Sequence, residues 1–377
     1  MPKQPHYTMD IVGEIARYDE RDMLFARQDL LRYFGPESPQ YQAYFKDNPI
    51  KERYHQSLSR KTPLGGKNCT DEPMFRAQFR WIDQLGAEDA VNGEFAAERK
   101  TFSEQSAARK VKAIARMYGA DLVGIAPLLQ QWTYSHVGAT AGDQPAYLPW
   151  GTPIDLSHHT HAIAMGFKMD QHLLASAPDF PTLLATAQAY ALSAWTAVRL
   201  AEYIRQLGYR ARAHHFSNYQ VLAVPIAVDC GLGELSRAGY LLTKEFGLAV
   251  RLSIVTTDLP MKPDNPRDIA VQSFCENCQR CVEACPSNAI PAGEKVEHNG
   301  ILKWKLDEEK CYAYWHVNGT DCGICMDVCP WTKPPTPFHR LMANLASKQG
   351  AHQRWMVYAD RIVYGPHKPA PNPDYLD

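Results

Sequence analysis

The stretch FCENCQRCVEACP, residues 274–286, determines how the rest of the chain is interpreted, because it spaces four cysteines as C-x2-C-x2-C-x3-C-P. A second run, CGICMDVCP at residues 322–330, repeats most of this spacing, and Cys311 lies upstream of it. Eight of the ten cysteines fall between residues 275 and 329. This concentration of thiols at short, regular gaps indicates metal ligands.

Both runs have the spacing of bacterial-type ferredoxin motifs. In these motifs three thiolates bind one [4Fe–4S] cluster, and the fourth cysteine, which precedes a proline, binds the other cluster. Gaps of two residues let three successive thiolates converge from a tight loop, and the three-residue step carries the last cysteine away. The sequence therefore predicts two clusters that exchange their fourth ligands. The predicted ligands are Cys275, Cys278, Cys281 and Cys329 for one cluster, and Cys285, Cys311, Cys322 and Cys325 for the other.

Zinc sites and disulfides are the alternatives for these cysteines. Zinc usually takes two separated pairs of ligands that complete one tetrahedron. Here three thiolates at two-residue gaps and a Cys-Pro pair occur twice, which fits a zinc site poorly. The two remaining cysteines, Cys69 and Cys230, lie far apart in the sequence, and we expect both to be buried structural thiols.

Length and charge limit the classes of function that fit this chain. The 377 residues predict about two to three domains. With 40 basic and 41 acidic residues, the chain has no overall basic field that would attract nucleic acid or an anionic membrane. The first residues show no apolar signal core and no paired arginines, and no run approaches about 18 apolar residues. We therefore expect a soluble, cytoplasmic protein, where thiols stay reduced.

The middle of the chain alternates segments with helical and with strand periodicity. Predicted helices cover residues 103–119 and 182–207, and predicted strands cover residues 121–126, 161–169, 221–228 and 246–257. The last strand carries Arg251 in an apolar setting. If this side chain points inward, it needs an anionic or phenolic partner.

Two further patterns suggest close packing or a ligand. In the long helix, Tyr190, Ala194, Ala197 and Ala201 recur at steps of four, three and four, so one face is small enough for a sheet or a flat cofactor to approach. The run 231–239 nearly matches the dinucleotide fingerprint G-x-G-x-x-G, but Ser236 replaces the third glycine. These glycines indicate a sharp turn or a ligand near the backbone.

Five runs, taken in order along the chain, resemble motifs of the cobalamin-dependent reductive dehalogenases, a family related to the epoxyqueuosine reductases. The runs are ADLVGIAP at 120–127, LAEYIRQLGY at 200–209, GLGELSRAG at 231–239, the strand start at 246–251 and TDLP at 257–260. Together with the cysteine motifs, the resemblance covers residues 116–331.

The resemblance implies an α+β fold: an α/β nitroreductase-like domain that buries base-off cobalamin, followed by a ferredoxin-like domain with two [4Fe–4S] clusters. The expected divisions are a helical and irregular cap over residues 1–100, the cobalamin-binding domain over 101–265, the ferredoxin-like domain over 266–345 and a tail over 346–377.

The resemblance also assigns site residues. Tyr190 resembles the family's proton-donating tyrosine, Arg251 the cationic residue beside it, and Asn218 the amide that faces the substrate in some members. A neighbouring cation stabilises a phenolate, so the first pairing is chemically reasonable. The segment 231–239 is implied to lie against the corrin. The expected cofactor contacts are therefore Tyr190, Asn218, Gly231, Gly233, Ser236, Arg237 and Gly239.

The implied reaction removes halide from a small organohalide, with electrons relayed by the two clusters. Some family members carry an export leader and others a fused reductase module. The sequence shows neither, so we expect a separate donor of the ferredoxin or flavodoxin type. Two alternatives remain: an epoxyqueuosine reductase acting on tRNA, which should need a basic, aromatic-flanked surface, and a ferredoxin-type electron-transfer protein without a corrinoid.

Overall fold

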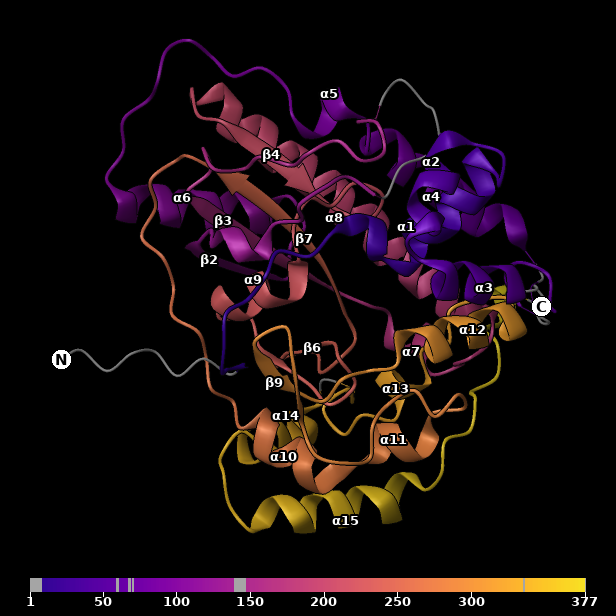
Figure 1. Ribbon diagram of the computed structural model, residues 1–377. Helices are drawn as coiled ribbons and strands as arrows, with labels where there is room; N and C mark the ends of the chain where they lie inside the picture. Colours follow the sequence, from indigo (N-terminus) through magenta and orange to yellow (C-terminus); the bar gives the residue numbers. More distant parts are fainter. Residues whose placement is uncertain are drawn as a thin grey trace.

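The computed structural model describes residues 9–58, 61–66, 69, 71–138, 147–334 and 336–376. Its centre is a four-stranded sheet in the order β2-β3-β7-β4, in which every neighbouring pair is antiparallel (Figure 1). The strands are β2 (Leu122–Pro127), β3 (His161–Lys168), β7 (Val250–Thr257) and β4 (Ala211–His214). The strands expected over 121–126, 161–169 and 246–257 are thereby confirmed, although the last begins four residues later.

The long helix α8 (Phe180–Gln206) packs along one face of the sheet beside α6 (Glu104–Met117). Ser103 caps α6, because its hydroxyl accepts a hydrogen bond from the backbone N–H of Ser106. Ala197 and Ala201 are fully buried against the sheet. Close packing of helix on sheet therefore explains the small face at these two residues.

The expected strand over 221–228 is wrong, because most of this segment forms the helix α9 (Ala223–Asp229), which packs on the other face of the sheet. Pro225 lies in the first turn of α9, where a missing backbone N–H costs nothing. In the middle of a strand the same proline would remove a ladder hydrogen bond. Apolar composition alone did not separate the two cases.

The described residues before α6 are mostly helical. Their helices are η1 (Glu20–Asp22), α1 (Leu24–Asp29), the π-helix η2 (Leu30–Phe34), α2 (Pro39–Lys46), α3 (Pro49–Ser57), α4 (Glu72–Leu85) and α5 (Glu88–Val91). Helix α4 packs against α8. The strand β1 (Asp10–Ile11) pairs with β9 (Ile301–Lys303), which also pairs with β8 (Val296–His298). The beginning of the chain is thus joined to the cysteine-rich region.

The cysteine-rich region lies at the lower end of the molecule in Figure 1. It contains α10 (Val271–Cys278), α11 (Arg280–Ala284), α12 (Glu308–Asn318) and α13 (Ile324–Asp327), followed by α14 (Pro337–Ala346) and α15 (His352–Tyr364). The short elements η3 (Gln130–Trp132), α7 (Gln171–Leu174), β5 (Glu234–Leu235), β6 (Leu241–Leu242) and η4 (Asp374–Leu376) complete the fold. Among the described residues, every helix is too short or too polar to cross a membrane.

Candidate active site

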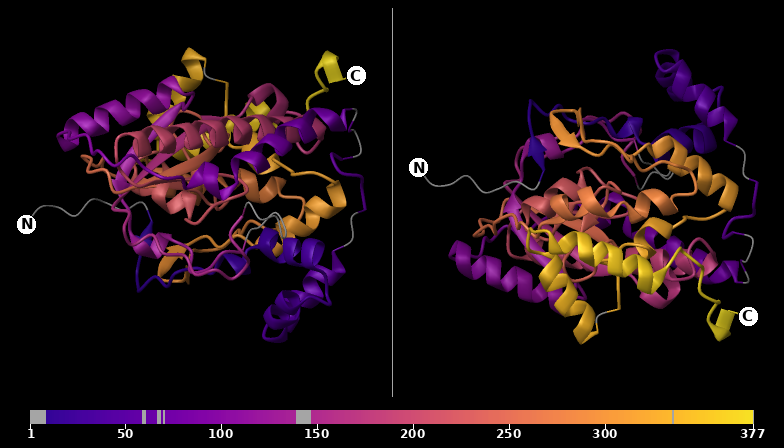
Figure 2. Two further views of the ribbon diagram at one scale, coloured as in Figure 1. Left: turned by 90° about the horizontal axis from the view of Figure 1, so that it is seen from above. Right: turned by 90° about the horizontal axis from the view of Figure 1, so that it is seen from below.

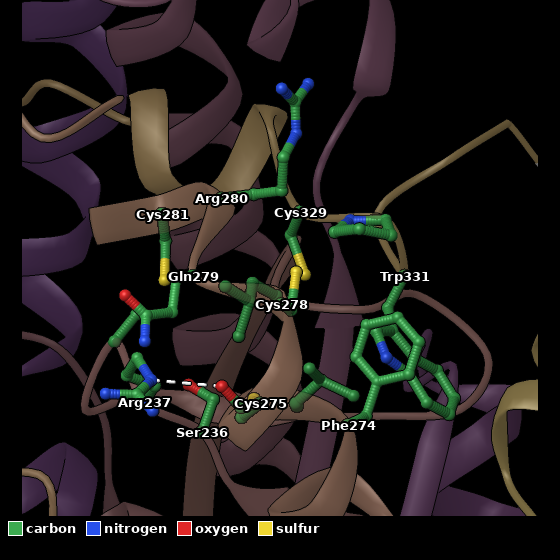
Figure 3. Close-up of a pocket in the computed structure, with 14 residues that line it drawn as sticks. Ser236, Arg237, Phe274, Cys275, Cys278, Gln279, Arg280, Cys281, Cys329 and Trp331 are labelled. Carbon is green, nitrogen blue, oxygen red and sulfur yellow. Dashed lines mark hydrogen bonds between the residues drawn. The ribbon is translucent and has the colours of Figure 1, made fainter. Parts of the chain in front are cut away.

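The first cysteine group consists of Cys275, Cys278, Cys281 and Cys329, which line one cavity (Figure 3). Helix α10 carries the first two, α11 the third, and the fourth follows α13. Gln279 has a left-handed backbone conformation with φ of 54°, which ends α10 and turns the chain into α11. This turn brings cysteines from two helices to the same cavity.

Ser236 and Arg237 also line this cavity, together with Phe274 and Trp331 (Figure 3). The Nε of Arg237 donates a hydrogen bond to the carbonyl oxygen of Cys275 at 3.0 Å, and its guanidinium lies 4.3 Å from the ring centroid of Trp304. Only 3% of Arg237 is exposed. The structure therefore places a buried cation next to the first cysteine group.

The second cysteine group consists of Cys285, Cys311, Cys322 and Cys325. Burial raises the pKa of the Cys311 thiol to about 11, and the neighbouring Cys285 adds to this increase. Burial also raises the pKa of Cys322 to about 12, with further contributions from Cys311 and Cys285. Cys285, Cys311 and Cys322 thus influence one another's pKa, and the division of the eight cysteines into two sets of ligands stays a prediction. Among the described residues, no three His, Cys, Asp or Glu side chains are placed to hold a single metal ion.

Arg251 points inward from β7 and contacts both a phenol and a carboxylate. Its guanidinium carbon lies 5.1 Å from the ring centroid of Tyr190. Its Nη2 donates a hydrogen bond to the hydroxyl of Thr186 at 2.8 Å and lies 3.7 Å from a carboxylate oxygen of Asp321. The Thr186 hydroxyl in turn donates to Asp321 at 2.6 Å. Arg251 is therefore held at three points.

This network adjoins the second cysteine group. Asp321 directly precedes Cys322 in the chain, and the Nη1 of Arg251 lies 3.9 Å from the sulfur of Met326, next to Cys325. Burial raises the pKa of the Tyr240 phenol well above its usual value, the Cys325 and Cys311 thiols raise it further, and Arg251 opposes the increase. The tyrosine and arginine thus share their surroundings with one set of four thiols.

The strand that carries Arg251 also holds buried polar atoms that lack a partner in the described part of the chain. On β7, Arg251 Nε and Ser253 Oγ are buried and have no hydrogen-bond partner within the described residues. These two residues are two positions apart, so they lie on the same face of the strand.

Asn218 lies in a different network from the one that the resemblance implies. Its side-chain oxygen accepts a hydrogen bond from Arg212 at 2.9 Å, and its side-chain nitrogen donates to the carbonyl oxygen of Gly86 at 2.8 Å. Arg212 also forms an ion pair with Glu88 at 2.5 Å. In this arrangement Asn218 ties the chain after β4 to the end of α4, and Arg212 ties β4 to α5.

The glycines of the run 231–239 make close contacts with the chain itself. A Cβ atom on Gly231 would lie 2.4 Å from the carbonyl oxygen of Asn265, and one on Gly233 would lie 2.1 Å from that of Leu242. Gly231 and Gly239 also have positive φ angles of 73° and 80°. Backbone packing and turns are therefore sufficient to explain these glycines.

Comparisons with known proteins agree with this arrangement. Residues 274–333 match the family model described as 4Fe-4S dicluster domain. The tetrachloroethene reductive dehalogenase of Dehalobacter restrictus is 34% identical over 343 residues, which cover 78% of this chain. The solved structure of a catabolic reductive dehalogenase in complex with 3-bromo-4-hydroxybenzoic acid matches with a TM-score of 0.75 and 26% identity over 96% of this chain. The chain belongs to the reductive dehalogenase family.

This member of the reductive dehalogenase family spans 61% of the length of the Dehalobacter restrictus protein and 48% of the chain in the solved structure. A more limited match is the epoxyqueuosine reductase of Atelocyanobacterium thalassa. It is 32% identical over 110 residues, which cover 27% of this chain and 35% of that protein.

Sequence reasoning missed several residues around Tyr190 in this dehalogenase-family chain. Thr186 precedes Tyr190 by four residues, so the two lie on the same face of α8. This spacing is visible in the sequence and could have indicated Thr186. Asp321 could have been noticed because it adjoins Cys322. Phe216 stacks on Tyr190 with a centroid separation of 4.5 Å, but this contact joins α8 to a distant loop, and no local pattern indicates it.

Proposed function

We propose that this protein is a corrinoid-dependent reductive dehalogenase that removes halide from a small organohalide, using electrons relayed by two [4Fe–4S] clusters. The observation that carries the proposal is the position of Arg251 over Tyr190 beside the second cysteine group. A proton-donating phenol, a cation and a set of thiolate ligands meet at one place. The family relationship supports the same reaction class.

The two cysteine groups fit iron–sulfur clusters by the chemistry of their donors. A [4Fe–4S] cluster requires four thiolate ligands. The four thiols of the first group line one cavity, and in the second group Cys311 and Cys285 raise the pKa of Cys322. The first group would hold one cluster beside Arg237, and the second would hold the other beside Asp321. The second cluster would then be the one that adjoins Tyr190, and the first would lie nearer to α15.

A corrinoid would lie beside β7, where Arg251 Nε and Ser253 Oγ are buried and have no hydrogen-bond partner among the described residues. When bound, the corrinoid supplies a low-valent cobalt that reduces the carbon–halogen bond. Residues 101–265 would provide most of this site, and residues 266–345 the clusters. The contacts first assigned to Ser236 and Arg237 are better explained by the first cysteine group, whose cavity they line.

The chain's own residues would act on the proton. Replacing halide by hydrogen follows R–X + 2e⁻ + H⁺ → R–H + X⁻, so each turnover needs two electrons and one proton. The Tyr190 hydroxyl would donate this proton to the carbon that halide leaves. Arg251 would stabilise the resulting phenolate, while Thr186 and Asp321 keep the guanidinium in place.

The decisive experiment uses protein reconstituted with iron, sulfide and corrinoid. We expect about eight iron atoms and one cobalt per chain, a corrinoid absorption band, and halide release from a halophenol with a small-molecule reductant. Reduction of an epoxyqueuosine-containing tRNA without halide release would instead favour the epoxyqueuosine reductase alternative. A protein that binds iron but no corrinoid would contradict the proposal and leave an electron-transfer protein.

A further inference from the structure

Helix α15 has one buried side and one strongly apolar exposed side. Gln353 and Val357 are buried, whereas Trp355, Tyr358 and Ile362 are 73%, 58% and 66% exposed. Spacings of three and four residues place these three side chains on one stripe of the helix. Large apolar residues that gather on one helix face mark an interaction surface, whereas singly scattered ones are ordinary.

Helix α14 carries a second stripe of the same kind. Phe338, Leu341 and Leu345 follow the same spacing and are 62%, 54% and 40% exposed. The two helices are tied at both ends, because His339 Nε2 hydrogen-bonds the Tyr364 hydroxyl at 2.5 Å and His352 Nε2 hydrogen-bonds the Leu345 carbonyl at 2.9 Å. Seen from below, α15 lies in front of the rest of the molecule (Figure 2, right). We call the exposed side of α14 and α15 the two-helix surface.

The two-helix surface is locally basic in a chain that is neutral overall. From Lys333 to Lys368 the sequence has six Lys and Arg residues and one acidic residue, Asp360. Asp360 is largely buried and lies 3.3 Å from Arg280. The exposed cations are Arg340, Lys348, Arg354, Arg361 and Lys368, of which Arg361 forms an ion pair with Glu283 at 2.6 Å. Apolar residues with surrounding cations have the anatomy of a protein interface that selects an acidic partner.

The helix α15, which carries part of the two-helix surface, packs on the first cysteine group. The Nη2 of Arg361 donates a hydrogen bond to the carbonyl oxygen of Cys278 at 3.1 Å, and the Nε of Arg354 donates to the side-chain oxygen of Asn277 at 3.0 Å. Helix α15 therefore packs directly on the backbone that carries two of the four cysteines. The network around Tyr190 contacts the second group instead, so each cysteine group has its own neighbour.

We propose that the two-helix surface is the docking site for an acidic, low-potential electron-carrier protein of the ferredoxin or flavodoxin class. This inference rests on the proposed function, because it assigns the entrance of the electrons used there. In each encounter the reduced carrier loses one electron and the cluster of the first cysteine group gains one. Two encounters supply the two electrons of one turnover.

The alternatives fit the observations less well. Two copies of this chain, joined through the same surface, would bring like charges together. Nucleic-acid interfaces are more polar and more charged than a surface centred on Trp355 and Ile362. A membrane surface would accept apolar and basic residues together, but it gives no reason for the position over the first cysteine group.

The test compares Ile362→Asp with Ile50→Asp in the reconstituted protein. Ile362 and Ile50 are on helices and are 66% and 73% exposed, but Ile50 belongs to α3, which lies apart from α15 (Figure 1). We expect Ile362→Asp to weaken binding of an acidic bacterial ferredoxin, measured by calorimetry, and to slow cluster reduction by that ferredoxin at least tenfold. Ile50→Asp should change neither. Arg354→Glu should weaken binding and reduce its dependence on salt.

A small-molecule reductant separates this inference from the proposed function. With titanium(III) citrate, Ile362→Asp should release halide as fast as the unmodified protein. Ferredoxin binding without any halide release would overturn the proposed function and leave the docking site supported. Unchanged ferredoxin binding in Ile362→Asp would overturn the docking site. The docking site would also be overturned if the only effect of Ile362→Asp were the loss of a dimer in sedimentation, of binding to anionic vesicles or of binding to tRNA.

Discussion

Arg251 lies over the ring of Tyr190, with its guanidinium carbon 5.1 Å from the ring centroid. The two residues come from different elements, β7 and α8, and the packing of α8 on the sheet sets their separation. Phe216 also stacks on the Tyr190 ring, with a centroid separation of 4.5 Å. Neither contact involves the phenolic hydroxyl, so the ring can be held in place while the hydroxyl remains available for chemistry.

The first prediction concerns that hydroxyl. Tyr190→Phe should keep the ring contacts and both iron–sulfur clusters, but should slow halide release by about 10²-fold or more, because a positioned acid contributes about 10²–10⁴-fold. Halide release with titanium(III) citrate measures the rate, and iron and cobalt analysis checks the loading. Tyr203→Phe is a matched control on α8, since the Tyr203 hydroxyl is buried without a hydrogen-bond partner in the described part of the chain. Full activity in Tyr190→Phe would remove Tyr190 from the mechanism.

The second prediction concerns Asp321, which holds Arg251 both directly and through Thr186. Asp321→Asn keeps the shape of the side chain but removes the counter-charge, so Arg251 should shift away from Tyr190. Halide release should then fall by roughly 10- to 100-fold, as expected for a small misplacement of a catalytic group. Asp327→Asn is the control, because Asp327 also precedes a cluster cysteine but pairs with His367. Equal loss of activity in the two variants would show that Asp321 has no specific role.

The spacing of the cysteines predicts that Cys275, Cys278 and Cys281 lie close together, because short gaps fix which thiols one loop can bring together, and these three line one cavity with Cys329. The ligand set of the second group stays a prediction. The sequence also predicts that Arg251, if it points inward, needs an anionic or phenolic partner. The structure supplies both, in Asp321 and Tyr190. The contacts of Asn218 and Arg237 could not be predicted from the sequence. Their partners lie far along the chain, at Gly86 and Cys275, and pair through tertiary packing that no local spacing encodes. The same is true of the stack between Tyr190 and Phe216.

The third prediction tests the ligand assignment. Cys325→Ser should remove the cluster of the second group and lower the iron content from about eight to about four per chain. Cys230→Ser is the control, because Cys230 lies outside both cysteine groups, in the core beside β3, with its thiol 3.6 Å from the carbonyl oxygen of Ala162. Iron analysis and the absorption spectrum of the clusters report the result. An unchanged iron content in Cys325→Ser would contradict the assignment of Cys325 to a cluster.

The fourth prediction concerns pH and the attachment of the C-terminal segment. His367 contacts Asp327 at 3.1 Å and the carbonyl oxygen of Ala177 at 2.7 Å, and thereby fastens the segment after α15 to α13. The hydrogen bond to Asp327 raises the pKa of His367 above its usual value. Its contribution to stability is therefore complete below about pH 6.5, the usual value for histidine, and is lost as the pH rises through the higher value of the folded protein.

His367→Gln should accordingly lower the melting temperature of the loaded protein by roughly 1–3 °C near pH 5.5, and by less near pH 9. The difference between the two proteins at each pH isolates this histidine, because all other titrating groups are shared. Asp327→Asn should reproduce the effect, since it removes the same ion pair from the other side. If the difference between the unmodified protein and His367→Gln were independent of pH, His367 would not be charged in the folded state and the ion pair would make no contribution.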